Sequence, residues 1–459
     1  MVFSSTFFLF GFLPAVIIFY YGQRLLFRQK LRNAVLLFCS YLFYLYGAAD
    51  FLLILILSTL ADFLFGRLIQ RNLKPTRLWL VLSLILNLGL LAYFKYANFF
   101  VGELSSAIIN FGIPSIEWQE VILPLGISFF TFKKISYIID VYRGKSRALE
   151  NVIDFALYIT MFPQLIAGPI VRFSYIRAQL KQRKESWDFF YRGGMRFCWG
   201  LVKKVMIANS CGRIADTIFS LDLELLDTKV AWLGSLTYTL QIYFDFSAYT
   251  DMAIGLGMLF GFTSPENFNR PYSAISITDF WRRWHITLGR WFRDYLYIPL
   301  GGNRKGTVRI CFNLALVFVL CGLWHGANWT FLCWGIYHGV FLILERITGI
   351  RSVSPDKNWV LRRAITLLIV TVGWVLFRSD DINQALGFLG AMFTVTDLPL
   401  SYELSLALNY RDVLFMLLAL PVFLLPGDFS VINTITAKKN PTLSFAGALV
   451  ILLLLPYCA

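Results

Sequence analysis

Only three histidines occur in this 459-residue chain, and all of them fall between residues 285 and 338. His285 follows the run Trp-Arg-Arg-Trp, whereas His325 and His338 lie in strongly apolar sequence. A titratable imidazole is costly to keep in hydrocarbon, so an intramembrane histidine suggests a function by default. Its chemistry would be proton transfer, because histidine can act as a general base toward a substrate hydroxyl. We therefore expect the reactive groups in residues 281–338.

His325 is the first candidate for that base. Apolar residues 312–323 precede it and apolar residues 329–344 follow it, which predicts a position at membrane depth. A buried histidine that only hydrogen-bonds between helices is the alternative interpretation, and the pattern leaves it open. Gly322, Gly326 and Asn328 permit a bend and the close approach of a substrate here, and Asn328 is also a candidate substrate-binding residue.

His338 follows His325 by thirteen positions, on a different face of any continuous helix. A structural role is therefore the expectation for His338. The histidines also lack the spacing of a metal site, with no HExxH pattern, so we expect no metal. Neither a GxSxG elbow nor a Walker lysine motif is present, which argues against a serine hydrolase or an NTPase.

Residues 281–297 separate two kinds of side chain when they are placed on one helix. Aromatic and apolar residues fall on one arc, arginines fall on another, and His285 lies at the margin. One interpretation is a helix in the membrane interface, with aromatics toward acyl chains. The other is a site for an anionic cytoplasmic ligand, because arginines recognise phosphate. The candidate ligand-binding residues are Arg282, Arg283, Trp284, Arg290 and Arg293.

Ionisable side chains also occur elsewhere in apolar sequence, where they are either functional or paired. Asp245 and Asp251 are candidate substrate-binding residues, and Asp62 and Lys134 are further examples. These groups could equally hold the arginines of 281–297 in place, and the sequence does not decide between the two roles.

Composition places these motifs in a membrane. Hydrophobic residues make up 58% and charged residues 15% of the chain, against roughly 45–50% and about 25% in soluble domains. Since roughly 20 apolar residues span a bilayer, about eleven or twelve segments are candidates for crossing or re-entrant helices. The prediction is an all-α, polytopic membrane protein with a central cavity and a single domain over residues 1–459. The seven scattered cysteines are expected in its core, and the +15 charge is expected on cytoplasmic loops and not at a nucleic-acid site.

Charged loops predict the topology. Basic loops at 22–32 and 67–77 would be cytoplasmic, and the acidic segment 101–120 outside, which puts the N-terminus outside. The first predicted helices are 7–21, 34–48, 51–66 and 78–100.

The later segments are less regular. Residues 152–171 contain Pro163, Gly168 and Pro169, so we expect a re-entrant or broken helix there. Residues 310–345 predict a hairpin-like helix pair broken around Gly326 and Asn328. The basic segment 263–309 would be cytoplasmic. A last internal loop is expected at Lys438 and Lys439, with the C-terminus outside.

Several motifs occur together in a fixed order. They are Pro163-Gln-Leu-Ile-Ala-Gly-Pro169, Asp245-Phe-Ser-Ala-Tyr-Thr-Asp251, Pro265-Glu-Asn-Phe-Asn-Arg-Pro271, Phe280-Trp-Arg-Arg-Trp-His-Ile-Thr-Leu288 and Leu323-Trp-His-Gly326. This set resembles the membrane-bound O-acyltransferase family, and within it the bacterial alginate O-acetyltransferase type. The resemblance covers nearly the whole chain, with its core motifs in residues 121–346.

That resemblance implies a funnel and tunnel through the bilayer. It implies His325 as the catalytic base and His285 as a second catalytic residue, either positioning the donor or acting as an acid. Acetyl-CoA would be the cytoplasmic donor, with no tightly bound cofactor. The acceptor would be an extracytoplasmic polysaccharide such as alginate, reached through a separate extracytoplasmic acetyltransferase protein. The bacterial cytoplasmic (inner) membrane is the implied location.

Three other functions remain as alternatives. D-alanyl transfer to teichoic acid from a carrier protein belongs to the same broad family. A transporter of lipid-linked sugars would usually show an internal repeat, and the sequence has none that we detect. A non-catalytic scaffold would tolerate the loss of His325.

Overall fold

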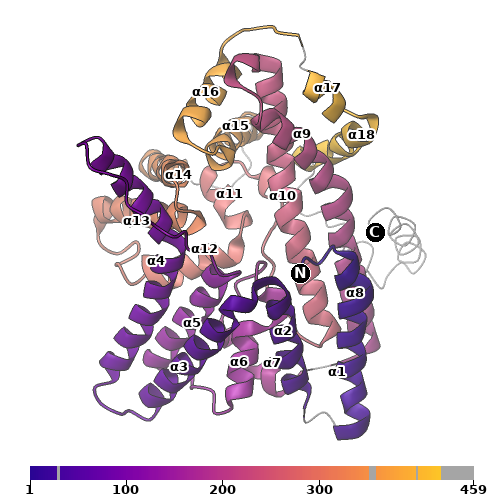
Figure 1. Ribbon diagram of the computed structural model, residues 1–459, viewed down its shortest axis with the longest axis vertical. Coiled ribbons are helices and arrows are strands. Elements are labelled where there is room, and N and C mark those ends of the chain that lie inside the picture. The colour runs from indigo at the N-terminus through magenta and orange to yellow at the C-terminus, as the bar shows by residue number, and fades with distance from the viewer. Residues whose placement is uncertain (28–30, 184, 351–357, 400–401, 425–459) are drawn as a thin grey trace. The chain divides into compact units, whose positions relative to one another are not determined.

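The computed structural model describes residues 1–27, 31–183, 185–350, 358–399 and 402–424 (Figure 1). All regular elements in these ranges are helical, which confirms the all-α prediction. The chain divides into two compact units, one of Met1–Gly194 with Ala253–Pro265 and one of Met195–Met252 with Glu266–Ala459. The single domain stays a prediction. The expected loop at Lys438 and Lys439 and the outer C-terminus lie outside the described residues.

The first unit begins with a π-helical stretch at Phe8–Phe12 that continues into a bundle of helices. Its helices are α1 (Leu13–Phe27), α2 (Arg32–Ala48), α3 (Leu52–Gln70), α4 (Thr76–Ile109), α5 (Ile127–Tyr142), α6 (Val152–Thr160) and α7 (Phe173–Lys181). The first four predicted helices are confirmed in number and order. Helix α4 continues to Ile109, into the segment that the sequence suggested was an outer loop.

Long apolar helices confirm a multi-pass membrane protein. Only 17% of the most apolar window of α4 is buried inside the protein, which leaves its large apolar side chains facing outward as lipid contact requires. The stretches long and apolar enough to cross a membrane, among the described residues, are Arg32–Gln70, Thr76–Ile109, Gly306–His325, Trp329–Thr348 and Trp359–Arg378.

Residues 152–171 form a broken helix, as predicted. Asn151 caps α6 by accepting a hydrogen bond from the Ile153 backbone N–H at 2.8 Å. The helix has nine residues, about 14 Å of rise, which is too short for a bilayer core of about 30 Å. Pro163 then lies in a 3-10 turn, and Gly168 has φ +103°, a conformation that favours glycine.

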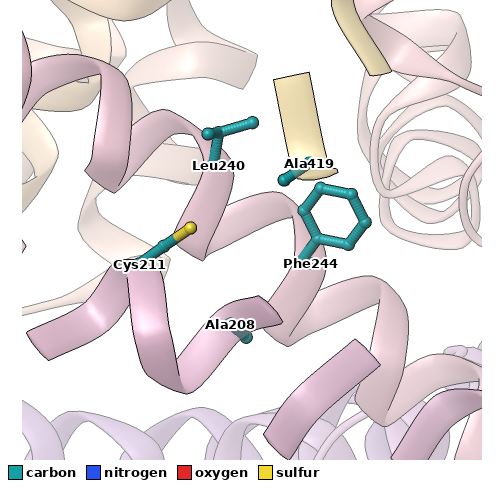
Figure 2. Packing of buried hydrophobic residues seen from close by; sticks show 5 residues of the cluster. All are labelled: Ala208, Cys211, Leu240, Phe244 and Ala419. Atoms are coloured by element: carbon teal, nitrogen blue, oxygen red, sulfur yellow. The ribbon is translucent and has the colours of Figure 1, made fainter. Parts of the chain in front are cut away.

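Helix α8 (Trp187–Val202) leads from the first unit into the second. The helices that follow are α9 (Asn209–Phe219), α10 (Thr228–Leu259), α11 (Ile277–Arg283), α12 (Ile286–Phe292), α13 (Gly306–His325), α14 (Trp329–Thr348), α15 (Trp359–Arg378), α16 (Ile382–Phe393), α17 (Tyr402–Ala407) and α18 (Tyr410–Ala419). The π-helical stretch Lys203–Ala208 and helices α9, α10 and α18 share a buried apolar cluster (Figure 2), whose members are Ala208, Cys211, Leu240, Phe244 and Ala419. Cys211 is therefore a small core residue, as predicted.

Helices α13 and α14 form the predicted hairpin, with the break at residues 326–328. Their backbones almost touch. A β-carbon on Gly322 would lie 2.3 Å from the carbonyl oxygen of Phe331, and one on Gly335 would lie 2.4 Å from that of Phe318. Real β-carbons do not come this close, so glycine is required at both positions of the crossing.

Candidate active site

The helix predicted over 281–297 is interrupted at its one histidine, His285. Helix α11 ends at Arg283, α12 begins at Ile286, and residues Arg293–Tyr297 form a π-helical turn. His285 has φ +44° and ψ +52°, in the left-handed region that non-glycine residues rarely adopt. The prediction of one continuous amphipathic helix is therefore wrong. Such outliers concentrate at functional sites, where surrounding contacts hold them in place.

Asn267 holds the chain at this break. Its backbone oxygen accepts a hydrogen bond from the Ile286 N–H at 2.9 Å. Its side-chain oxygen accepts from the Thr287 N–H at 3.2 Å and from the Thr287 hydroxyl at 2.8 Å, and it lies 3.1 Å from Nδ1 of His285. The first backbone N–H groups of α12 are thus satisfied from a segment that lies earlier in the chain.

A second clamp fixes the start of α11. The Glu345 carboxylate, on α14, accepts hydrogen bonds from the backbone N–H groups of Ile277 at 2.6 Å and Thr278 at 2.8 Å. Ser276 adds a cap by accepting from the Asp279 N–H at 3.0 Å. A carboxylate suits a helix N-terminus because it complements both the free N–H groups and the helix dipole.

A cavity of about 620 Å³ opens beside α11 and α12. Its wall combines three arginines with apolar and aromatic side chains, and His285 contributes to it. Its principal lining residues are Trp281, Arg282, His285, Arg290, Phe292, Arg293, Tyr297, Phe318 and Cys321. Among the described residues that line it, none carries a carboxylate. The cavity therefore offers cationic groups and an apolar surface to the same ligand.

The structure brings together three of the four predicted arginines. Arg282, Arg290 and Arg293 line the cavity and are exposed, so their guanidinium groups are available to an anion, although Arg293 also pairs with Asp294. Arg283 is not part of the lining. Its Nε donates a hydrogen bond to the Asp279 carboxylate at 2.9 Å, so its guanidinium group pairs within α11.

Trp284 is also outside the cavity lining. It is 4% exposed and packs on Phe280 and Trp374, with ring centroids 5.6 and 4.8 Å away. Leu288 and Trp291 are likewise buried within the protein. The apolar arc of 281–297 therefore faces the protein interior, and the interpretation of these side chains as a membrane anchor is wrong.

His285 is buried, with 2% of its surface exposed. Burial lowers the pKa of its imidazole to about 3, so the ring is neutral at physiological pH. Nδ1 lies against Asn267, whereas Nε2 has no hydrogen-bond partner among the described residues. A neutral ring with a free nitrogen at a cavity wall can accept a hydrogen bond or a proton from a ligand.

His325 occupies a different environment, at the last residue of α13. It is half-buried, and its ring contacts those of Trp324, Trp334 and Phe377 at centroid distances of 4.9, 5.1 and 5.0 Å. It does not line the cavity, whose α13 wall ends at Cys321, one turn earlier. Trp324 contacts both histidine rings, with its centroid 6.2 Å from that of His285.

His338 is fully buried in α14, and the break at 326–328 changes its predicted relation to His325. The ring centroids of His325, on α13, and of His338, on α14, each lie 5.1 Å from the ring centroid of Trp334. The His338 ring also packs edge-on against Trp281 at 5.1 Å. These contacts support the structural role that we predict for His338.

The two aspartates of α10 are engaged elsewhere. Asp251 binds Arg196 at 2.8 Å and Lys203 at 2.6 Å, and Asp245 binds Lys204 at 2.6 Å. Neither pairs with an arginine of 281–297, so that option is wrong for both. Neither lines the cavity, and their roles in substrate binding stay predictions.

Asn328 caps a helix. Its side-chain oxygen accepts from the Thr330 N–H at 2.9 Å, and its amide donates to the carbonyl oxygen of Asp380 at 2.6 Å. This contact ties the α13–α14 turn to the segment that follows α15. Sequence reasoning missed Asn267, Thr287 and Glu345, because their contacts join positions far apart in the chain. Position within the quoted motifs was the available signal for Asn267.

These features define a class: a polytopic all-helical membrane protein with a basic cavity and a buried neutral histidine in its wall. The comparison with protein families identifies it further. Residues 87–376 match the family described as MBOAT, membrane-bound O-acyltransferase, and the chain belongs to that family.

Three curated relatives illustrate the range of similarity. The chain is 48% identical to the "Probable alginate O-acetylase AlgI" of Pseudomonas syringae pv. tomato, over 87% of this chain and 77% of that protein. It is 38% identical to the peptidoglycan O-acetyltransferase of Helicobacter pylori, with 85% and 80% covered. It is 29% identical to the teichoic acid D-alanyltransferase of Bacillus subtilis, with 67% and 85% covered. The predictions of an enzyme and of an acyl transfer to oxygen are confirmed.

Proposed function

We propose that this enzyme moves an acetyl group from acetyl-CoA across the membrane for the O-acetylation of an extracytoplasmic polysaccharide, with alginate as the first candidate. The observation that carries the proposal is the cavity at α11 and α12, with three exposed arginines and the buried His285 in one wall. The names of the alginate and peptidoglycan acetylating relatives support acetyl as the group and a polysaccharide as the acceptor.

The cavity suits a coenzyme A thioester on chemical grounds. Guanidinium groups form paired, charge-assisted hydrogen bonds with phosphate oxygens, so Arg282, Arg290 and Arg293 would hold the phosphates of the donor. Apolar side chains such as Phe318 would line the path of the flexible arm. The free nitrogen of His285 would accept a hydrogen bond from an N–H of that arm.

In this scheme His325 is the general base. It takes the proton of the acceptor hydroxyl while the oxygen attacks the carbonyl carbon of the thioester. The carbon–sulfur bond then breaks, the thiolate leaves, and the proton held by His325 neutralises it, so that the base is regenerated. Because His285 is neutral, it lacks the second, acidic proton of an imidazolium, and the donor-positioning role is favoured over the acid role.

We further propose the bacterial inner membrane as the location and a separate extracytoplasmic acetyltransferase as the partner that delivers acetyl groups to the polymer. A cytoplasmic donor and an outer acceptor require the acyl group to cross the bilayer. The basic segment 263–309, which carries the cavity arginines, would face the cytoplasm by the positive-inside rule.

The test uses the full-length protein in proteoliposomes with radiolabelled acetyl-CoA outside and an alginate oligosaccharide enclosed as acceptor, with and without the extracytoplasmic partner. Cells expressing wild type or His325→Ala provide a second measurement, the acetyl content of their envelope polysaccharide at matched membrane protein levels. Acetyl loss in the variant supports the proposal. Unchanged acetylation overturns the role of His325, and a fall in D-alanine ester instead supports the rival donor.

A matched control separates phosphate recognition from general charge loss. Arg192 on α8 has a side chain that is 47% exposed and pairs only with Asp188 among the ion pairs of the described residues. Arg192→Ala removes the same charge as Arg290→Ala but leaves the cavity unchanged. Only Arg290→Ala should raise the KM for acetyl-CoA.

A further inference from the structure

The orientation of the Asn267 side chain is fixed by a group that can only donate. The backbone N–H of Thr287 points at one end of the amide, at 3.2 Å. A backbone N–H has no acceptor capacity, so the group that faces it must be the carbonyl oxygen and not the NH₂. The Thr287 hydroxyl, 2.8 Å from the same atom, then donates as well.

This orientation decides where the proton of His285 lies. Nδ1 of His285 is 3.1 Å from that same Asn267 oxygen. An oxygen that only accepts requires a donor, so Nδ1 carries the proton. In a neutral imidazole the other nitrogen then holds the lone pair, and that nitrogen is Nε2. Nε2 has no hydrogen-bond partner among the described residues, and His285 lines the cavity.

We infer that Asn267 is a positioning residue that sets the tautomer of His285, so that Nε2 is presented to the cavity as a hydrogen-bond acceptor. This inference rests on the proposed function, since it names the part of the donor that His285 recognises. The matching group on the ligand is an N–H or O–H donor, such as the amide N–H of a pantetheine arm. A ligand with only acceptor atoms at that point would form no hydrogen bond with Nε2 of His285.

The side chain of Asn267 is not needed simply to hold the break in the helix. Its backbone oxygen already bonds the Ile286 N–H at 2.9 Å, and the Asn269 N–H bonds the Arg283 oxygen at 2.9 Å on the other side. These two backbone bonds pair the segments whatever side chain stands at 267. The side-chain oxygen adds the one contact that specifies the ring nitrogens.

Nitrogen NMR of ¹⁵N-histidine-labelled protein in lipid bilayers tests the inference directly, because the chain contains only three histidines. His285→Gln identifies the resonances of His285 by their loss. In wild type we expect a protonated Nδ1 and an unprotonated Nε2. In Asn267→Leu, where the acceptor is lost, we expect the Nε2–H form to appear. Asn267→Asp, whose carboxylate still accepts, should keep the wild-type pattern.

Thr287→Val is the matched control, since it removes a second donor to the same oxygen while Asn267 remains. Its His285 tautomer should match wild type. A wild-type His285 with the proton on Nε2 overturns the inference, even if Asn267→Leu fails to fold. An unchanged tautomer in a folded Asn267→Leu overturns it as well.

Activity provides the second readout. Asn267→Leu should lower kcat/KM for acetyl-CoA by about tenfold or more, and Asn267→Asp should recover part of the loss. If wild type takes no acetyl from acetyl-CoA but its tautomer still depends on Asn267, the proposed function fails while the positioning role stands. If transfer occurs and the tautomer does not depend on Asn267, the positioning role fails alone.

Discussion

The Asp62 cluster of the first unit and the His285 cluster of the second are both buried polar groups, but they differ in how completely they are satisfied. Asp62 is fully buried and accepts hydrogen bonds from Ser83 and from Asn87, with Lys134 beside it at 4.0 Å. The Lys134 ammonium in turn donates to Ser58 at 2.6 Å. Charge and hydrogen bonds are thus balanced inside one closed group drawn from α3, α4 and α5.

At His285 the balance is left incomplete, because neither Nε2 of His285 nor the side-chain nitrogen of Asn267 has a hydrogen-bond partner among the described residues. Asn267 occupies Nδ1, and Nε2 is left for whatever enters the cavity. Leaving a buried polar group unsatisfied costs stability, and at a cavity wall a ligand can supply the missing partner. The comparison separates two roles of buried polar residues in a membrane protein. A cluster whose hydrogen bonds are all satisfied holds helices together, whereas a cluster with an unsatisfied atom at a cavity can bind a ligand.

The largest expected effect comes from breaking the closed cluster. Asp62→Leu leaves the Lys134 charge buried without its partner, which should lower the free energy of unfolding by about 3–5 kcal/mol. Unfolding in detergent measures this loss. The double variant Asp62→Leu/Lys134→Met should recover most of it, and a single variant as stable as wild type would contradict the closed-cluster interpretation.

The open cluster should show the opposite behaviour. His285→Ala should reduce kcat/KM for acetyl transfer by about a hundredfold, because an acceptor in the donor site is lost. Its midpoint of thermal unfolding should change far less than that of Asp62→Leu. Steady-state kinetics and unfolding on the same preparations check both statements, and a variant with normal kinetics but a lowered midpoint would place His285 with the structural group.

A smaller effect is expected at an exposed arginine of the cavity lining. Arg290→Ala should raise the KM for acetyl-CoA by about tenfold with kcat little changed, since a charge-assisted contact to phosphate is lost. Added salt should narrow the difference between variant and wild type, because Arg290 is exposed and therefore screened. An effect on kcat alone would argue against phosphate binding at this position.

The smallest expected effect concerns acid stability. His285 has a folded-state pKa lowered to about 3 by burial, against about 6.5 when unfolded. Between these values only the unfolded chain binds the proton, so stability is unaffected above pH 6.5 and falls as the pH drops toward 3. From pH 6.5 to 5.5 the loss should be about 1 kcal/mol. His285→Gln should remove this part of the pH dependence, and an unchanged slope would show that the ring is already charged or exposed.

Much of the fold could be predicted because it depends on local composition. Apolar runs of sufficient length gave α1 to α4, and Pro163 and Gly168 indicated the broken helix at 152–171. Gly326 and Asn328 indicated where the hairpin turns. Each of these signals lies within the segment that it shapes.

The site was harder to predict because its geometry depends on distant contacts. Residues 281–297 have a periodicity compatible with one helix, and the residue type of His285 does not predict its φ of +44°. The break is held by backbone hydrogen bonds to the segment of Asn267, eighteen residues before His285. The pair of Arg283 with Asp279 is a local contact one turn apart, whereas the place of Arg282 in the cavity depends on α13 and α14, which supply the rest of the lining.

The crossing of α13 and α14 has a consequence for genetics. Gly322 and Gly335 carry no reactive group, yet any side chain there collides with the backbone of the opposite helix. Loss-of-function screens scored only by polymer modification would therefore return these glycines beside His325, as if all three took part in the reaction. Scoring protein abundance in the same screen would separate them, since only the glycine variants should disappear from the membrane.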